Sequence, residues 1–230
     1  MNARTWTDEE VGPGVLSRAA AGVYRCLVLE LLLVLTTLPT AAALVVLERD
    51  PSNLPLYLLA LLPAGPAVVA GLAAARSWEV DRDLSPARGF WRAYRRDALG
   101  TLSWWAPLLL VATVPALNIA YADAVPGGAA LRPVSLVIAA LLVVLAAHLA
   151  VIQARFTFRL RDAVRIALIE VLPQWRFSLG VLSLLLIGAT ITVLAFDVVA
   201  ALLAWAAVLL LHAMARPLVT DITERFTRHD

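Results

Sequence analysis

Residues 133–155 read PVSLVIAALLVVLAAHLAVIQAR, an almost unbroken apolar run that ends in an arginine. About 20 apolar residues are enough to cross the hydrocarbon layer of a bilayer as a helix. Similar runs recur through the 230-residue chain, which is 61% hydrophobic and only 16% charged. A soluble domain is about half apolar and a quarter charged. The composition therefore predicts a helical membrane protein.

We expect an all-α fold in which residues 1–230 form a single transmembrane domain with six helices. The last apolar run, residues 178–215, is too long for one helix, so we divide it at Phe196 and Asp197. A charge there lies best at the membrane interface. The predicted spans are residues 22–47, 54–75, 100–121, 133–154, 178–195 and 199–215.

The arginines lie on one side of these spans. All 19 residues counted as lysine or arginine are arginine, which we interpret as the codon usage of a GC-rich bacterial genome. Residues 76–97 hold six of them and residues 155–176 hold five, whereas the opposite loops hold only Arg49 and Arg132. Short arginine-rich loops stay in the cytoplasm. We therefore expect a multi-pass protein of the bacterial cytoplasmic (inner) membrane, with both termini in the cytoplasm.

Two arginine-bearing segments, residues 84–98 and 157–172, are expected to form amphipathic cytoplasmic helices. Ser85 is a suitable N-cap for the first, and Pro86 suits its first helical position. In the second, an apolar stripe through Ala167 lies opposite a polar side that includes Glu170. Basic amphipathic helices favour anionic lipids, whereas aromatic and arginine side chains also favour protein interfaces. Both alternatives stay open for the surface formed by Arg88, Phe90, Trp91, Arg92, Tyr94, Arg95 and Arg96.

An internal repeat relates the two arginine-rich segments. Ala75-Arg76 recurs 79 residues later as Ala154-Arg155, and the spacing from Arg96 to Gly100 recurs 80 residues later at 176–180. A fainter third copy begins at Arg18 and Gly22 and ends in Ala215-Arg216. We interpret the pattern as three parallel membrane hairpins, an arrangement that in transporters often has a site at the repeat interface.

Two ionisable residues inside the spans are candidates for an intramembrane site. Glu30 and His148 both lie about 10–12 Å from the cytoplasmic face at about 1.5 Å per residue. Together they can pair or relay a proton. Alternatively, Glu30 reaches the interface or bonds to Arg25, and His148 is satisfied by a backbone carbonyl. The further polar candidates are Thr36, Thr37, Thr40 and Asn118.

Proline and glycine interrupt several spans. Each proline removes a helix hydrogen bond and frees a carbonyl, which must be buried in protein or line a cavity. The interruptions therefore indicate either a ligand path or packing kinks. The small residues Ala67, Gly71 and Ala75 follow at helical spacing and predict a close helix contact. The helix breaks are Pro39, Pro63, Gly65, Pro66, Pro107 and Pro115.

Three segments resemble the YesL family of small bacterial membrane proteins. They are Leu38-Pro39-Thr40, residues 61–67 (LLPAGPA) and residues 90–96 (FWRAYRR), and the resemblance covers residues 16–106. It implies an accessory role in carbohydrate ABC transport, with transporter subunits as partners, and it carries over no catalytic or binding residue. The alternative is a self-sufficient transporter or channel for small solutes, with a path along the Pro-interrupted helices. A homo-oligomer is compatible with both alternatives.

The chain lacks the sequence patterns of the common enzyme classes. There is no phosphate-binding glycine loop, no paired Cys/His spacing for a metal and no nucleophile elbow. We therefore expect no enzyme, no catalytic residues, no metal and no cofactor. The net charge of +2 is too small to indicate binding of nucleic acid.

Overall fold

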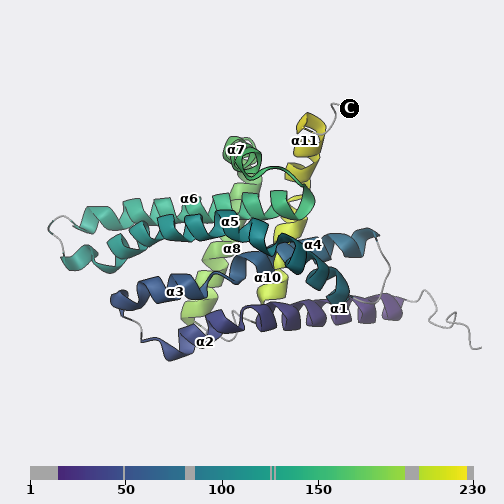
Figure 1. The fold of residues 1–230 in the computed structure, drawn as a ribbon, viewed down its shortest axis with the longest axis horizontal. Helices are drawn as coiled ribbons and strands as arrows, with labels where there is room; N and C mark the ends of the chain where they lie inside the picture. The colour runs from purple at the N-terminus through teal and green to yellow at the C-terminus, as the bar shows by residue number, and fades with distance from the viewer. Residues whose placement is uncertain are drawn as a thin grey trace, which may run out of the picture.

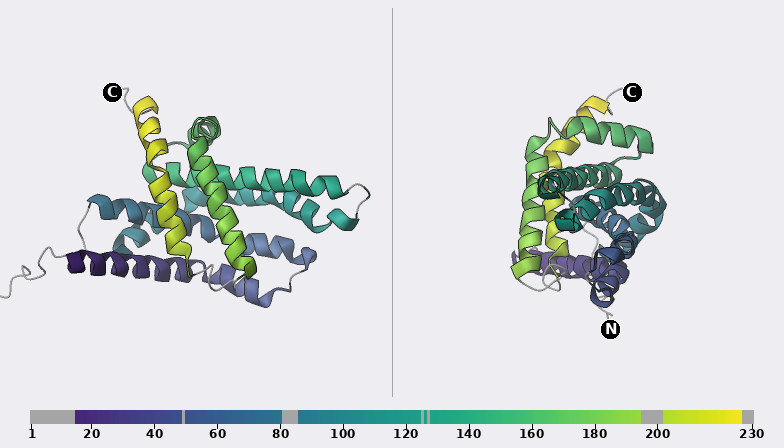
Figure 2. Two further views of the ribbon diagram at one scale, coloured as in Figure 1. Left: turned by 180° about the vertical axis from the view of Figure 1, so that it is seen from behind. Right: turned by 90° about the vertical axis from the view of Figure 1, so that its left-hand side faces the viewer.

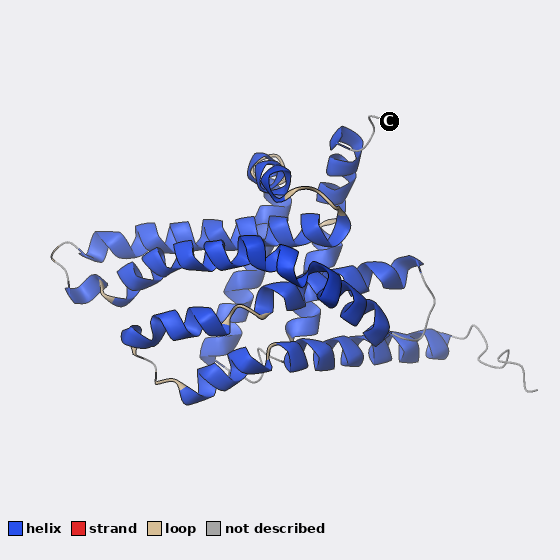
Figure 3. Ribbon diagram, viewed as in Figure 1, coloured by secondary structure: helices blue, strands red, loops and turns tan. Residues whose placement is uncertain are grey.

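The structure, a computed structural model, describes residues 15–48, 50–80, 86–124, 126, 128–194 and 202–226. Within these ranges the chain is helical and has no strand (Figure 3), so the all-α prediction is confirmed. The helices are α1 (Val15–Thr36), α2 (Leu38–Val46), α3 (Leu54–Ala60), α4 (Ala64–Val80), α5 (Pro86–Ala120), α6 (Gly128–Arg155), α7 (Leu160–Glu170), α8 (Trp175–Leu194), α10 (Ala204–Met214) and α11 (Arg216–Phe226), with 3-10 turns η1 (Pro51–Asn53) and η2 (Ala122–Ala124).

Several helices are long and apolar enough to cross a membrane. A sixth span arises in the described residues only if α10 and α11, bent by 42°, count as one. The predicted boundary at residues 196 and 197 lies outside the described ranges, between the end of α8 and the start of α10. By length and composition, which are typical of a membrane protein, the five candidate spans in the described residues are Ala19–Thr36, Leu54–Trp78, Pro86–Ala120, Gly128–Arg155 and Trp175–Thr192.

The first two predicted spans are each broken into two helices. The break between α1 and α2 lies at Thr37, and the break between α3 and α4 lies at residues 61–63. Pro39 and Pro66 fall in the first turns of α2 and α4, where a missing N–H costs no helix hydrogen bond. By contrast, α5 remains helical through both Pro107 and Pro115.

The first arginine-bearing segment is not a separate amphipathic helix. Predicted segment 84–98 and predicted span 100–121 form one helix of 35 residues, α5. Gly100 lies at the expected junction, but one glycine costs only about 1 kcal/mol in a helix, too little to end it. Pro86 begins α5 as predicted, whereas Ser85 lies outside the described residues. The second segment does form its own helix, α7.

Helix α4 lies in the middle of the molecule, with α1 on one side and α5 and α6 on the other (Figure 1). The arginine-bearing ends of α4, α5 and α6 lie toward the same side of this group. Helices α8 and α10 run across the direction of α5 and α6 in both views of Figure 2. The repeat had predicted parallel hairpins. The hairpin of α8 and α10 instead runs across the hairpin of α5 and α6.

The small-residue face of α4 forms the close contact that its spacing predicts. Ala67 and Ala75 are buried, with exposed fractions of 0% and 3%. A Cβ added at Gly71 would lie 3.1 Å from Cγ1 of Val208 in α10 and 3.6 Å from Cδ1 of Leu29 in α1. The absence of a side chain at this position therefore lets α1 and α10 approach the α4 backbone.

The sequence repeat has a structural counterpart in two helix hairpins. In each, a glycine of the first helix packs against a side chain near the end of the second. A Cβ at Gly100 in α5 would lie 2.9 Å from Nε2 of Gln153 in α6, and one at Gly180 in α8 would lie 2.6 Å from Sδ of Met214 in α10. Gln153 and Met214 each precede an Ala-Arg pair. A Cβ at Gly22 meets no atom of the described chain within 4 Å, so the faint copy does not share this closure.

We predict that Gly65→Ala destabilises the protein by about 1–3 kcal/mol, because it overpacks the contact between α4 and α5. The added Cβ would lie 2.6 Å from two ring atoms of Trp105. Thermal unfolding in detergent micelles measures the effect. Gly188→Ala is the matched control: its Cβ meets open space, and alanine is the better helix former. Equal melting temperatures for Gly65→Ala and the wild type would contradict the close packing.

Candidate functional site

Glu30 connects α1 to the start of α10. Its side chain is only 8% exposed, and Oε2 accepts a hydrogen bond of 2.9 Å from the backbone N–H of Trp205. Trp205 is the second residue of α10, where backbone N–H groups lack helical partners and the helix dipole is positive. Leu203, at the N-cap, supplies no side-chain bond of its own. Glu30 therefore acts as the capping residue that α10 does not carry itself.

His148 is fully buried between α6 and α8. Its Nδ1 lies 2.9 Å from the carbonyl oxygen of Val144, and Phe177 meets the ring edge-on with centroids 4.8 Å apart. The backbone carbonyl expected in the alternative interpretation of His148 is thus the partner found. Among the described residues, no hydrogen bond or ion pair joins His148 to Glu30. The two residues hold different helix contacts and do not form one polar site.

The carbonyls at the break between α3 and α4 are satisfied by side chains from other helices. The N–H of Ala64 bonds to the carbonyl of Leu61, which leaves the carbonyl of Ala60 without its helical partner. The hydroxyl of Thr40 donates to Ala60, and Nε1–H of Trp105 donates to Leu61 at 3.0 Å. Two carbonyls of the break that Pro63 and Pro66 create are therefore bonded to side chains of the protein.

The remaining polar candidates make local contacts. Thr36, the last residue of α1, donates to the carbonyl of Leu32, and Thr37, at the break, donates to that of Leu33, each at 2.7 Å. Such bonds to the preceding turn satisfy the hydroxyl without a ligand. Asn118 is half-buried near the end of α5.

The aromatic residues expected on the cytoplasmic surface belong largely to the core. Phe90 is fully buried, which corrects its place on that surface. It stacks on Tyr94 and meets Trp91 edge-on, with centroids 6.1 Å and 5.9 Å apart. Trp91 and Tyr94 are half-buried against the core. The exposed part of the surface, here called the α5 arginine face, consists of Arg88, Arg92, Arg95 and Arg96.

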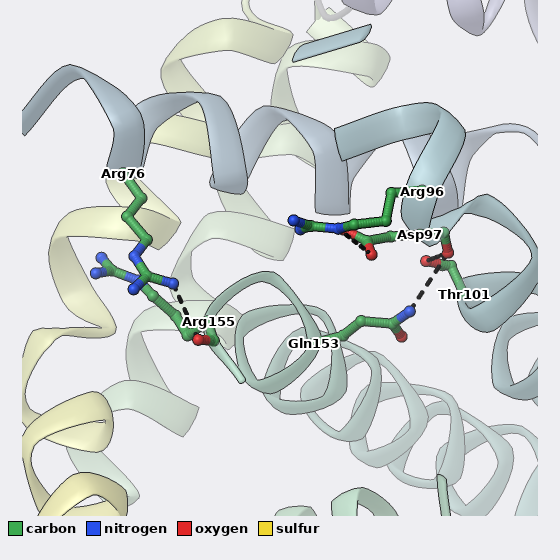
Figure 4. A network of polar contacts seen from close by, with 6 residues as sticks. All are labelled: Arg76, Arg96, Asp97, Thr101, Gln153 and Arg155. Carbon is green, nitrogen blue, oxygen red and sulfur yellow. Dashed lines mark hydrogen bonds and ion pairs between the residues drawn. The ribbon is translucent and has the colours of Figure 1, made fainter. Parts of the chain in front are cut away.

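A polar cavity of about 340 Å³ lies where the arginine-bearing ends of α4, α5 and α6 meet α7. Nη1 of Arg76 donates to the carbonyl of Arg155 at 2.9 Å (Figure 4). Arg96 pairs with Asp97 through two hydrogen bonds of 2.9 Å and 2.8 Å. Arg76 and Arg155 are not among the residues that the sequence predicts for a site, although their offset of 79 residues was the signal that relates them.

Hydrogen bonds between α5 and α6 hold the wall of this polar cavity. Nε1–H of Trp104 donates to Oε1 of Gln153, and Nε2 of Gln153 donates to the carbonyl of Asp97 at 3.4 Å. Thr101, fully buried, donates to the same carbonyl at 2.9 Å. Gln153 thus ties the end of α6 to the turn of α5 that bears Asp97 (Figure 4).

An apolar cavity of about 450 Å³ lies among α4, α5, α6, α8 and α10. Gly65, Trp105, Ala147 and Gly188 are among the residues that line it. Trp104 lines both this cavity and the polar one.

A buried carboxylate connects α7 to α11. Glu170 is fully buried, although the sequence pattern had placed it on the polar side of α7. Oε1 of Glu170 lies 3.8 Å from Nη1 of Arg225, whose Nε also lies 3.1 Å from Oδ1 of Asp221. Burial raises the pKa of Glu170 above its usual value, the negative charge of Asp221 raises it further, and Arg225 partly offsets both. The prediction for Glu170 was wrong because this side of α7 packs against α11. The local pattern of α7 does not reveal that partner helix.

We predict that Glu170→Gln removes a pH dependence from the stability. The folded protein binds the Glu170 proton more tightly than the unfolded chain. This contribution is fully present below the unfolded pKa of about 4.3 and is lost as the pH rises through the folded pKa. Melting temperatures from about pH 4 to pH 8 should therefore fall more for the wild type than for the variant. The control is Glu224→Gln, at an exposed position of α11, which should keep the wild-type slope.

The chain matches no protein-family model, and no curated protein or solved structure is significantly similar to it. The resemblance to the YesL family therefore stays a prediction. In the described part of the chain, no three His, Cys, Asp or Glu side chains are grouped to hold a metal ion.

Proposed function

We propose that this chain is a non-enzymatic integral membrane protein that assists a carbohydrate ABC transporter through a contact at its cytoplasmic surface. The observation that carries the proposal is the α5 arginine face. These exposed guanidiniums stand on the same continuous helix that continues as a membrane span. A partner bound there is coupled rigidly to the transmembrane part, because no loop intervenes. The resemblance to the YesL family supplies the class of partner.

The proposal places the arginine-bearing ends of α4, α5 and α6, and both termini, in the bacterial cytoplasm. Support comes from Arg76, Arg96 and Arg155, which meet at one cavity although they belong to different helices. A repeat of two hairpins is proposed on the shared closure of the α5–α6 and α8–α10 hairpins. The amphipathic helix α7 then lies on the cytoplasmic surface, with its arginines toward the lipid headgroups.

Cysteine labelling tests this orientation. In a Cys26→Ser background, we predict that single cysteines at Ser52 and Ala129 react with an impermeant thiol reagent in intact cells. Cysteines at Arg88 and Glu224 should be protected until the membrane is opened. All four positions are exposed in the structure, so protection reports the side of the membrane. Labelling of Arg88→Cys in intact cells would reverse the orientation.

A triple variant tests the contact with the transporter. We predict that Arg88→Gln, Arg92→Gln and Arg95→Gln together leave the protein folded in the membrane but reduce copurification of ABC-transporter subunits at least about tenfold, because arginines often dominate interfaces. Growth on one carbohydrate should slow as it does after deletion of the gene. The matched control replaces Arg159, Arg161 and Arg165, which are exposed near or on α7, by glutamine.

Two outcomes would overturn the proposal. An equal loss of copurification in the α7 control would mean that net charge, and not the α5 arginine face, holds the partner. Solute movement by the purified protein alone in liposomes would replace the accessory role with the self-sufficient transporter. The cavities that share Trp104 are the observation that favours this alternative, whereas the bonded carbonyls at the break between α3 and α4 speak against a polar path there.

A further inference from the structure

We propose that the polar cavity binds a phosphate group, and that its source is the headgroup of an anionic phospholipid. The site is distinct from the partner contact on the α5 arginine face, and the inference does not depend on that proposed function. Arg96 is the one residue that both surfaces share.

The charge of the lining favours an anion. Three guanidiniums, those of Arg76, Arg96 and Arg155, line the polar cavity together with a single carboxylate, that of Asp97. They come from three different helices, so the fold concentrates positive charge that is dispersed in the sequence. A concave surface lined by one sign of charge raises the local concentration of the opposite ion.

The side chains of Arg76 and Arg96 are held in place and still have donors for a ligand, whereas Nη2 of Arg155 lies 3.3 Å from Nδ1 of His212. A guanidinium has five N–H bonds, and its planar fork matches the oxygens of a phosphate. Asp97 engages Nε and Nη2 of Arg96, and the carbonyl of Arg155 engages Nη1 of Arg76. Figure 4 shows the end of the Arg96 side chain directed toward the side on which Arg76 and Arg155 lie. Such preorganisation lowers the entropic cost of binding.

The cavity has walls that are built into the fold. Gln153 bonds to Trp104 and to the backbone of Asp97 across the contact between α5 and α6. Gly100 lines the cavity, and a Cβ there would lie 2.9 Å from Nε2 of Gln153. The space therefore depends on a glycine and on a fixed amide, which distinguishes it from a group of mobile surface arginines.

Two features favour a lipid over a soluble phosphate ester. The polar cavity is lined on another side by Phe156 and Phe158, whose rings stack with centroids 5.2 Å apart. Trp104, which lines the polar cavity, also lines the apolar cavity of about 450 Å³. A molecule with a phosphate next to an acyl chain matches this succession of charged, aromatic and apolar surfaces. A soluble phosphate ester matches only the first.

Native mass spectrometry of the purified full-length chain tests the proposal. The probes are dioleoyl phosphatidylglycerol, dioleoyl phosphatidylcholine and inorganic phosphate, the last compared with chloride at equal ionic strength. We expect Arg76→Gln combined with Arg96→Gln to weaken phosphatidylglycerol binding about tenfold or more, because charge-assisted bonds are lost. Arg88→Gln combined with Arg92→Gln is the matched control, since it removes the same charge from α5 outside the polar cavity. The control should bind like the wild type.

The outcomes separate the sources of the phosphate. Loss of phosphatidylglycerol in the double variant alone supports the lipid headgroup. Binding of inorganic phosphate that the double variant loses, without any preference between the lipids, supports the phosphate site but overturns the lipid as its source. Equal loss in the control variant overturns the proposal, because surface charge then accounts for the binding. No preference between the lipids and no response to phosphate also overturns it.

A second variant covers the case in which the double variant does not fold. Arg96→Lys keeps the positive charge but loses the planar fork that binds phosphate through two bonds. The Arg96 side chain is 63% exposed, so this change leaves the packing intact. We expect an unchanged melting temperature in phosphatidylcholine and weaker phosphatidylglycerol binding. Binding as tight as that of the wild type contradicts the site.

Discussion

The fold depends on the close packing of α4, a helix with small side chains at the positions where other helices approach it. In lipid there is no hydrophobic force that drives apolar helices together, so contact distance and van der Waals packing decide which helices associate. Gly71 admits Val208 and Leu29 to the backbone of α4, and Gly65 admits the indole of Trp105. Helices α1, α5 and α10 therefore take their positions from residues that contribute almost no side chain. The bulk at each contact comes from the partner helix.

The polar groups of the interior follow a second constraint, since a backbone group left unpaired in the membrane costs several kcal/mol. Three side chains meet this cost across helix boundaries. Glu30 accepts from the backbone N–H of Trp205 in α10, Thr40 donates to the carbonyl of Ala60, and Trp105 donates to the carbonyl of Leu61. Each bond therefore fixes one helix relative to another. Residues that look functional because they are polar within a span are, in these cases, the groups that hold broken or short helices together.

Hydropathy and spacing predict the local features of this protein well. The apolar runs predict the helices, the spacing of Ala67, Gly71 and Ala75 predicts their contact, and Pro86 begins its helix as expected. The pattern fails where the outcome depends on a distant partner. The residues near Glu170 in the sequence do not predict its contact with α11. The residues near Phe90 do not indicate whether its ring lies in the core or on the surface.

The candidate site shows the same division between local and distant information. The sequence indicates an arginine-rich side of the membrane, but the arginines that meet at the polar cavity come from segments far apart in the chain. Arg76 and Arg155 lie in contact because the ends of α4 and α6 converge. Hydropathy does not predict which helix ends converge. Their equivalent places in the repeat were the available hint. A repeat relates positions in sequence and does not by itself say that those positions touch.

The crossing of α8 and α10 over α5 and α6 has a consequence for the orientation of the protein in a bilayer. Helices that span a bilayer are tilted by about 0–40° from its normal. A normal that follows α5 and α6 leaves α8, about 30 Å long at 1.5 Å per residue, extending far along the membrane plane. Helices α5 and α8 therefore cannot both follow one membrane normal, and the orientation of the protein in its bilayer decides which of them crosses it.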